Sequence, residues 1–141
     1  MQVMLEVNPK FEIRNTKQTQ MTKIQNSKRY DLEERTLEFA KRVRAFVKKL
    51  KKTIANIEDG RQLVKASGSV GGNYIEANEA LSKKDFVMRI KICRKEAKES
   101  GYWLKLVDNE DDTELERERR ELIQEATELT NIFGSILRKS E

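Results

Sequence analysis

Proline occurs once, at Pro9, so the rest of the chain can form long helices without a break. Beyond the first 30 residues, apolar side chains recur at spacings of three, four and seven, as they do on one face of an α-helix. This pattern predicts helices at about 32–55, 60–80, 83–107 and 114–138, with short connections between them. We therefore predict an all-α fold, an antiparallel up-down-up-down four-helix bundle.

Three of the predicted helices begin with a capping signal. Asp31, Ser82 and Thr113 can each accept a bond from a backbone amide, and each is followed three positions later by an acidic residue. The second helix is expected to follow a turn over Asn56 to Gly60. The residues expected in the core are Leu32, Phe39, Val43, Phe46, Leu50, Ile54, Ile57, Leu63, Ala66, Val70, Tyr74, Ala77, Leu81, Phe86, Ile90, Cys93, Ala97, Leu104, Val107, Leu115, Leu122, Ala126, Leu129, Phe133 and Ile136.

In residues 1–30 the apolar side chains show neither a sustained helical spacing nor a sustained strand-like alternation. They are expected to form an N-terminal arm, mobile or docked at an edge, ahead of a bundle domain over residues 31–141. A short strand pair is expected around Asn8 and Pro9, and Met21 is a candidate natural start.

The composition excludes several kinds of site. Without histidine there is no Ser-His-Asp or Cys-His system and no imidazole metal ligand, and one cysteine cannot form an intrachain disulfide. The acidic run from Asp108 to Asp112 lacks the glycine and terminal glutamate of a calcium loop, and is expected to be a solvated turn. No apolar run is long enough to span a membrane and no signal segment opens the chain. We expect a cytoplasmic protein without cofactor or metal and without membrane association.

The net charge of +5 is unevenly distributed. Basic residues outnumber acidic ones over residues 31–56 and 82–107, and the reverse holds over 108–141. The basic faces of the first and third helices either bind nucleic acid or are neutralised by the acidic fourth helix. Few aromatics accompany them, so contact with backbone phosphates is expected rather than base stacking. The candidate nucleic-acid-binding residues are Lys41, Arg42, Lys48, Lys49, Lys52, Lys84, Lys91, Arg94, Lys95 and Lys98.

The second predicted helix has glycines in its middle, at Gly68, Gly71 and Gly72. Each costs about 1 kcal/mol relative to alanine. We interpret them as places where another backbone approaches closely, because their spacing does not match a phosphate-binding loop and no strand precedes them.

Polar residues also line the second and third helices. Ser69, Asn73 and Glu76 share one flank of the second helix, where they favour a hydrogen-bonded helix contact over a catalytic role for Glu76. One flank of the third helix carries Met88, Ile92, Glu96, Glu99 and Trp103. This flank is either a contact between subunits or a widening of the core by Trp103. Glu96 and Glu99 are expected to pair with arginines such as Arg61 or Arg89, or to bind a divalent ion.

Three segments together carry a family resemblance: residues 62–77 with a Ser-Val-x-x-Asn-x-x-Glu pattern, 82–86 with Ser-Lys-Lys-x-Phe, and 94–104 with Lys-Glu-Ala-x-Glu and Trp-Leu. They resemble the bacterial four-helix bundle family named after the 23S ribosomal RNA intervening sequences that encode some members. The resemblance covers roughly residues 30–138, and the chain departs from it at Gly71 and Gly72, where the family usually has other residues.

The resemblance implies a barrel-shaped homopentamer in which helices of adjacent subunits touch. It also brings in accessory proteins of diversity-generating retroelements, which contact nucleic acid and a reverse transcriptase, although this chain looks closer to the intervening-sequence branch. The recurrent family residues that carry over as folding and assembly positions are Ser69, Asn73, Glu76, Phe86, Glu96, Glu99 and Trp103.

These observations lead to one main hypothesis. The chain is expected to be a non-enzymatic, oligomeric bundle that binds nucleic acid or a ribonucleoprotein partner through the basic faces of its first and third helices. One alternative is a protein-interaction scaffold without nucleic-acid affinity. A second is a metal-dependent nuclease that uses Glu76, Glu96 and Glu99.

Overall fold

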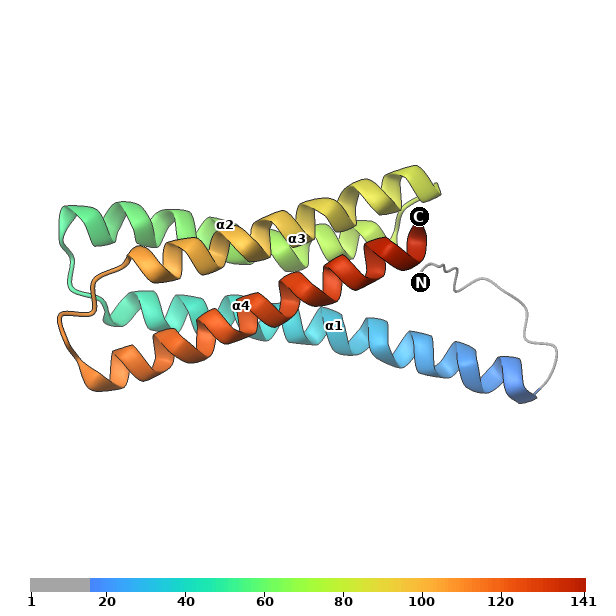
Figure 1. The fold of residues 1–141 in the computed structure, drawn as a ribbon, viewed down its shortest axis with the longest axis horizontal. Helices are drawn as coiled ribbons and strands as arrows, with labels where there is room; N and C mark the ends of the chain where they lie inside the picture. The colour runs from blue at the N-terminus through green and yellow to red at the C-terminus, as the bar shows by residue number, and fades with distance from the viewer. Residues whose placement is uncertain (1–15) are drawn as a thin grey trace.

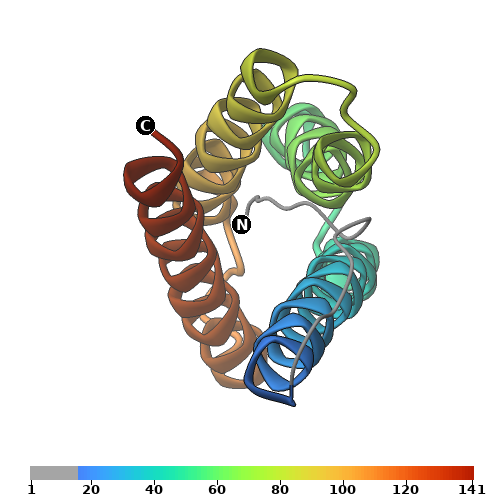
Figure 2. The same cartoon turned by 90° about the vertical axis from the view of Figure 1, so that its right-hand side faces the viewer.

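The computed structural model describes the backbone of residues 16–141 and the side chains of residues 32–141. This part of the chain forms α1 (Thr16–Lys49), α2 (Ile54–Asn78), α3 (Lys83–Leu106) and α4 (Thr113–Ser140), and contains no strand. Each helix runs antiparallel to the one before it (Figure 1). Viewed along the bundle, each lies beside its neighbours in sequence, and α4 lies beside α1 (Figure 2). The predicted all-α, antiparallel four-helix bundle is confirmed.

The first helix begins earlier than predicted. α1 starts at Thr16, so Asp31 lies inside it and is not an N-cap, and the second half of the expected arm is helical. Residues 16–30 contain neither proline nor glycine, and adding a turn to an existing helix is far easier than starting one. The first part of α1 consequently projects past the ends of the other helices (Figure 1). The strand pair expected around Asn8 and Pro9 lies outside the described residues.

The connection between α1 and α2 was also placed wrongly. α1 ends at Lys49, and Thr53 is the N-cap of α2, with its hydroxyl accepting a hydrogen bond from the amide of Asn56. The turn expected over Asn56 to Gly60 is the first part of α2. Ile54 and Ile57 therefore belong to α2, where they are exposed, instead of extending the core stripe of α1.

The other helix boundaries match the predictions closely. The hydroxyl of Ser82 caps α3 by accepting from the amide of Asp85, as expected. In α4 the cap is Asp112 and not Thr113, because the carboxylate of Asp112 accepts from the amide of Leu115 at 3.0 Å. An aspartate at this position also favours the positive end of the helix dipole.

The core is formed where the four apolar stripes meet. The predicted core is confirmed except at Ile54, Ile57 and Leu81, which are exposed, and at Phe86 and Ile136, which are half-buried. Tyr74 of α2 and Phe133 of α4 bring their rings together across the centre, with centroids 5.8 Å apart. The largest fully buried side chains are Phe39, Phe46, Phe133, Leu63, Ile90, Leu104, Leu122, Leu129, Val43, Val70, Val107 and Thr36.

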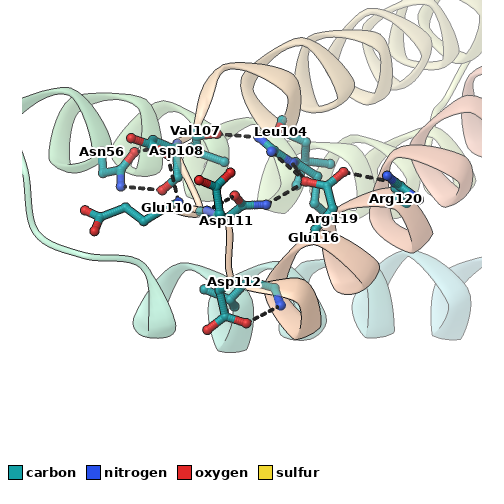
Figure 3. A network of polar contacts seen from close by, with 12 residues as sticks. Asn56, Leu104, Val107, Asp108, Glu110, Asp111, Asp112, Glu116, Arg119 and Arg120 are labelled. Carbon is teal, nitrogen blue, oxygen red and sulfur yellow. Dashed lines mark hydrogen bonds and ion pairs between the residues drawn. The ribbon is translucent and has the colours of Figure 1, made fainter.

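Asn56 joins the two connections at one end of the bundle (Figure 3). Its side-chain amide donates to the carbonyl oxygens of Lys51 at 3.0 Å and Asp108 at 2.9 Å, and its side-chain oxygen accepts from the amide of Asp108 at 2.9 Å. Asn56 is 4% exposed, so these bonds form away from water. A single buried side chain thus ties the α1–α2 connection to the α3–α4 connection.

The acidic run between α3 and α4 is ordered by hydrogen bonds of its own. Asn109 is buried and donates to Glu116, while Glu110 and Asp111 adopt left-handed backbone conformations with φ of 51° and 62°. Hydrogen bonds from Arg119, Asn109 and Arg120 lower the pKa of Glu116 to about 2. Arg119 in addition donates to the carbonyl oxygens of Leu104 and Val107 at the end of α3 (Figure 3). Asn109 is buried, whereas Asp108, Glu110, Asp111 and Asp112 are exposed, so the run is the solvated turn that was expected, and these hydrogen bonds fix its shape.

Two of the three glycines in the middle of α2 do lie against α1. A methyl group added at Gly71 would stand 2.9 Å from the hydroxyl oxygen of Thr36, and one added at Gly68 would stand 3.2 Å from the guanidinium of Arg44. The neighbouring Gly72 faces open space, with nothing within 4 Å of the added carbon. Close approach of α1 explains Gly71. At Gly68 the neighbour is the end of the exposed and flexible Arg44 side chain, which can move aside, and no contact within the described residues explains Gly72.

The adjacent pair Gly71 and Gly72 gives opposite predictions for the same change. Gly72→Ala is expected to stabilise the protein by about 0.5–1 kcal/mol, because alanine favours the helix and meets no neighbour. Gly71→Ala is expected to destabilise it by about 1–3 kcal/mol, because Thr36 is buried and cannot move aside. Urea unfolding of both variants checks this, and equal effects of the two changes would show that α1 and α2 can separate without cost.

Candidate nucleic-acid interface

The basic flank of α3 forms one row along the helix surface. Lys91, Lys95, Lys98 and Lys105 follow one another at helical spacings of four, three and seven, and all are exposed. Lys84 is exposed in the first turn of the helix, two turns before Lys91. The only ion pair of this row within the described residues is a long one, 3.9 Å from Lys95 to Glu96. Its positive charges are therefore mostly uncompensated.

This row borders a groove between α3 and α4. The groove has a volume of about 520 Å³ and contains no carboxylate among its lining residues. Gly134 of α4 lines it without a side chain, and a β-carbon added there would lie 3.8 Å from Cδ of Arg94. Two polar side chains, Thr130 and Asn131, lie along the α4 side. The cations that line it are Lys91, Arg94, Lys95, Lys98 and Arg138.

The basic face of α1 is in a different situation, because part of it meets the acidic half of α4. Arg42 lies 3.4 Å from Glu121, and Lys49 lies 3.0 Å from Glu118. Lys51, in the connection to α2, lies 3.5 Å from Glu110. Lys41, Lys48 and Lys52 are exposed, and none has an ion pair within the described residues. α4 thus neutralises part of the basic face of α1, but it does not neutralise the basic row of α3.

A second groove shows the same difference. Between α1 and α4 lies a groove of about 440 Å³, similar in size to the one beside α3. Arg42 and Arg120 line it together with three carboxylates, those of Glu121, Glu125 and Glu128. A phosphate backbone would meet repulsion there, whereas the groove between α3 and α4 offers only cations and neutral groups.

The contribution of α4 to the basic groove was not predicted from the sequence. Its overall acidic charge concealed that its acidic residues all lie between Glu114 and Glu128, while Arg138 and Lys139 lie in the last turn. Antiparallel packing places that last part of α4 beside Lys91 and Arg94 of α3. If the charges of the fourth predicted helix are counted separately along its length, the part after Glu128 carries only the positive charge of Arg138. Antiparallel packing then predicts that Arg138 lies beside the basic third helix.

The polar line on α2 meets α3, as expected. The side chain of Asn73 donates to the carbonyl oxygen of Ser69 at 2.9 Å and accepts from Arg89 of α3 at 3.0 Å. Arg89 also lies 3.8 Å from Glu76. Arg89 therefore pairs with Glu76, and the expected pairing of Arg89 with Glu96 or Glu99 is wrong, as is that of Arg61, which lies near Glu58.

The second flank of α3 combines apolar and acidic side chains at the surface. Phe86 and Trp103 pack partly against the core, so Trp103 does widen the core seam. Ile92 is half-buried, Met88 is exposed, and the carboxylate-bearing side chain of Glu96 is only 18% exposed. Burial raises the pKa of Glu96, and the neighbouring charge of Glu99 raises it further. Water hydrates a half-buried carboxylate beside apolar residues only incompletely.

The carboxylates of the nuclease alternative do not gather into one site. Glu76 lies beside Arg89, whereas Glu96 lies near Lys95 and exposed Glu99. Within the residues that the structure describes, no group of three or more acidic or cysteine side chains is placed to hold a metal ion. Among the same residues, no helix has the length and apolarity needed to cross a membrane.

Comparisons with known proteins agree with the fold and with the sequence segments described above. The family model of the 23S rRNA-intervening sequence protein matches residues 28–135. The fold is similar to a crystal structure from Bacteroides thetaiotaomicron, that of a protein with unknown function from the S23 ribosomal protein family. The TM-score is 0.62 and the identity 27%, over 74% of this chain and 96% of that one. No curated protein sequence matches the chain. The match over most of its length shows that the chain belongs to the 23S rRNA-intervening sequence protein family.

Proposed function

We propose that this protein is a non-enzymatic bundle that binds the phosphate backbone of nucleic acid in the groove between α3 and α4. The observation that supports it is the set of five cations lining an open groove that contains no carboxylate. Cations held together in this way bind a polyanion by releasing its condensed counterions. A ribonucleoprotein partner such as a reverse transcriptase complex, which the family resemblance suggests, would be reached through the same nucleic acid.

The basic face of α1 has a smaller part in this proposal. Arg42 and Lys49 already have carboxylate partners on α4, and a phosphate would have to compete with these. Arg94 and Lys98 have no ion pair within the described residues and face the groove. We therefore place the main phosphate contacts on α3 and Arg138.

The proposal predicts that removing two groove charges weakens binding more than removing two charges elsewhere. Arg94→Gln with Lys98→Gln is expected to lower the affinity for a labelled RNA or DNA about tenfold in 50 mM salt, and to flatten the dependence of log affinity on log salt by about two contacts. Fluorescence anisotropy over a salt series measures both quantities.

The matched control is Lys41→Gln with Lys48→Gln, which removes the same charge from exposed positions on α1. Its expected loss is about twofold, from the change in net charge alone. Equal losses from both pairs would show that binding follows net charge and not the groove. A wild-type protein without affinity for RNA or DNA in 50 mM salt would eliminate the proposal.

We also propose that the chain assembles into an oligomer, a pentamer by family resemblance, through the second flank of α3. Ile92, Met88 and the half-buried Glu96 support this, because another copy would cover all three. Ile92→Glu is expected to shift the mass in light scattering toward the monomer, while the helical circular dichroism is kept. An unchanged mass would place the contact elsewhere. Ile92 is a better probe than Trp103, which also packs against its own core.

The scaffold alternative is favoured by the exposed apolar residues at the start of α2. Ile54 is 84% exposed, and Ile57 borders a groove of about 290 Å³ beside Val47 and Val64. A partner protein that covered this surface would leave the groove between α3 and α4 unused. Lack of nucleic-acid affinity in the salt series favours this alternative.

A further inference from the structure

The row of lysines on α3 contains one exposed aromatic ring. Tyr102 follows Lys98 by four residues and precedes Lys105 by three, so it lies on the same helix surface as Lys91 and Lys95. It is 57% exposed. The ring stands edge-on to that of Trp103, with centroids 5.0 Å apart and an angle of 75° between the planes. Since Trp103 packs partly against the core, this contact limits the movement of Tyr102.

On the exposed surface of a highly charged helix, folding does not normally require a tyrosine ring to be held in place. Here it lies one turn beyond the end of the basic groove, at a rise of about 6 Å from Lys98. A strand whose phosphates follow Lys91, Lys95 and Lys98 therefore reaches Tyr102 with its next nucleotide. Aromatic side chains between cations are the arrangement with which proteins bind unpaired bases.

The ring of Tyr102 also favours an unpaired strand over a duplex. The bases of a duplex are already paired and stacked on one another, so they would not offer a free face to Tyr102. We propose that this groove binds single-stranded nucleic acid, with one unpaired base stacked on the ring of Tyr102. This inference rests on the proposed function and names the class of nucleic acid.

The test is a double-mutant cycle between the ring and a base. Labelled 12-nucleotide strands of uridine (RNA) and of thymidine (DNA) are compared with abasic strands of the same length and with a duplex. Tyr102→Ala is expected to weaken binding of the single strands about tenfold and to leave the salt dependence unchanged, because no phosphate contact is lost. It is expected to change affinity for the abasic strand and the duplex less than twofold. The RNA and DNA arms show whether the 2′-hydroxyl contributes.

Two control variants separate stacking from other effects. Tyr102→Phe keeps the ring and is expected to bind like the wild type. Leu106→Ala removes exposed apolar surface one turn further along α3 and is expected to have no effect. Equal loss by Tyr102→Ala for strands with and without bases would overturn the stacking inference, as would wild-type affinity of that variant for single strands. In both cases the charge-dependent binding of the proposed function would still stand, whereas absence of all binding by the wild type would remove both.

Discussion

Asn56→Ala is expected to lower the free energy of unfolding by about 3 kcal/mol. The side chain makes three hydrogen bonds. Its loss leaves the amide and the carbonyl oxygen of Asp108 without these partners, while the carbonyl oxygen of Lys51 keeps a bond from the amide of Thr53 at 3.0 Å. An unpaired buried backbone group costs about 1–3 kcal/mol, which is more than the net value of the bond itself. Urea unfolding monitored by circular dichroism measures the change.

The effect is expected to exceed that of an ordinary helix position because Asn56 joins two connections. Both meet at the same end of the bundle, where Asn56 hydrogen-bonds to Lys51 of one connection and to Asp108 of the other. Without it, the α1–α2 and α3–α4 connections keep only the exposed pair of Lys51 and Glu110, 3.5 Å apart, and the packing of the helices to fix their relative position within the described residues. We therefore expect faster hydrogen exchange at the amide of Asp108 in the variant as well.

Asn131→Ala is the matched control. Asn131 is an exposed asparagine within α4, and alanine there is expected to be neutral or slightly stabilising through helix propensity. If Asn56→Ala costs less than about 1 kcal/mol, water has replaced the lost bonds, and the connections are held by the core and not by this side chain.

The helices themselves were predictable because their information is local and repeated. A stripe such as Phe39, Val43, Phe46 and Leu50 is readable from spacing alone, and all of these residues are buried. Asn56 was misread for the opposite reason. Asparagine near glycine is typical of a turn, but here its bonds to residues far away in sequence place it inside a helix. Tertiary contacts overrode a local propensity that was read correctly.

The distribution of charge over the helix faces was only partly predictable from the sequence. Segment totals predicted a basic third helix and an acidic fourth helix, and the open question was whether they neutralise each other. In the bundle, α4 neutralises charges of α1 but not those of the basic row on α3. The acidic part of α4 lies along α1, with Glu121 beside Arg42, while its basic end lies along α3, with Arg138 beside the groove. The position of charge within a helix, not its sum, decides which face stays basic.

Arg35→Glu is expected to destabilise the protein by about 3 kcal/mol, through the contact between α1 and α4. These two helices touch less than any other neighbouring pair in the bundle. Arg35 donates two parallel bonds to Glu125, at 2.7 and 2.8 Å, and a third to Glu128 at 2.8 Å. The Arg35 and Glu125 side chains are 31% and 16% exposed, and their bonds raise the pKa of Arg35 further above its usual value. The change replaces a bidentate pair with three neighbouring carboxylates.

Arg42→Glu serves as the comparison, because Arg42 lies 3.4 Å from Glu121 and both side chains are more exposed, at 39% and 49%. It is expected to cost less than about 1 kcal/mol, as exposed ion pairs generally do. Exchange of the charges, Arg35→Glu with Glu125→Arg, is expected to recover about 2 kcal/mol of the loss, since the pair is restored in reverse. Added salt should reduce the cost of Arg35→Glu by screening the repulsion. Equal costs at Arg35 and Arg42, or no recovery on exchange, would mean that α1 is held to α4 by apolar contact alone. In that case the acidic half of α4 has no structural task at this seam, and the basic face of α1 becomes as available to a phosphate backbone as that of α3.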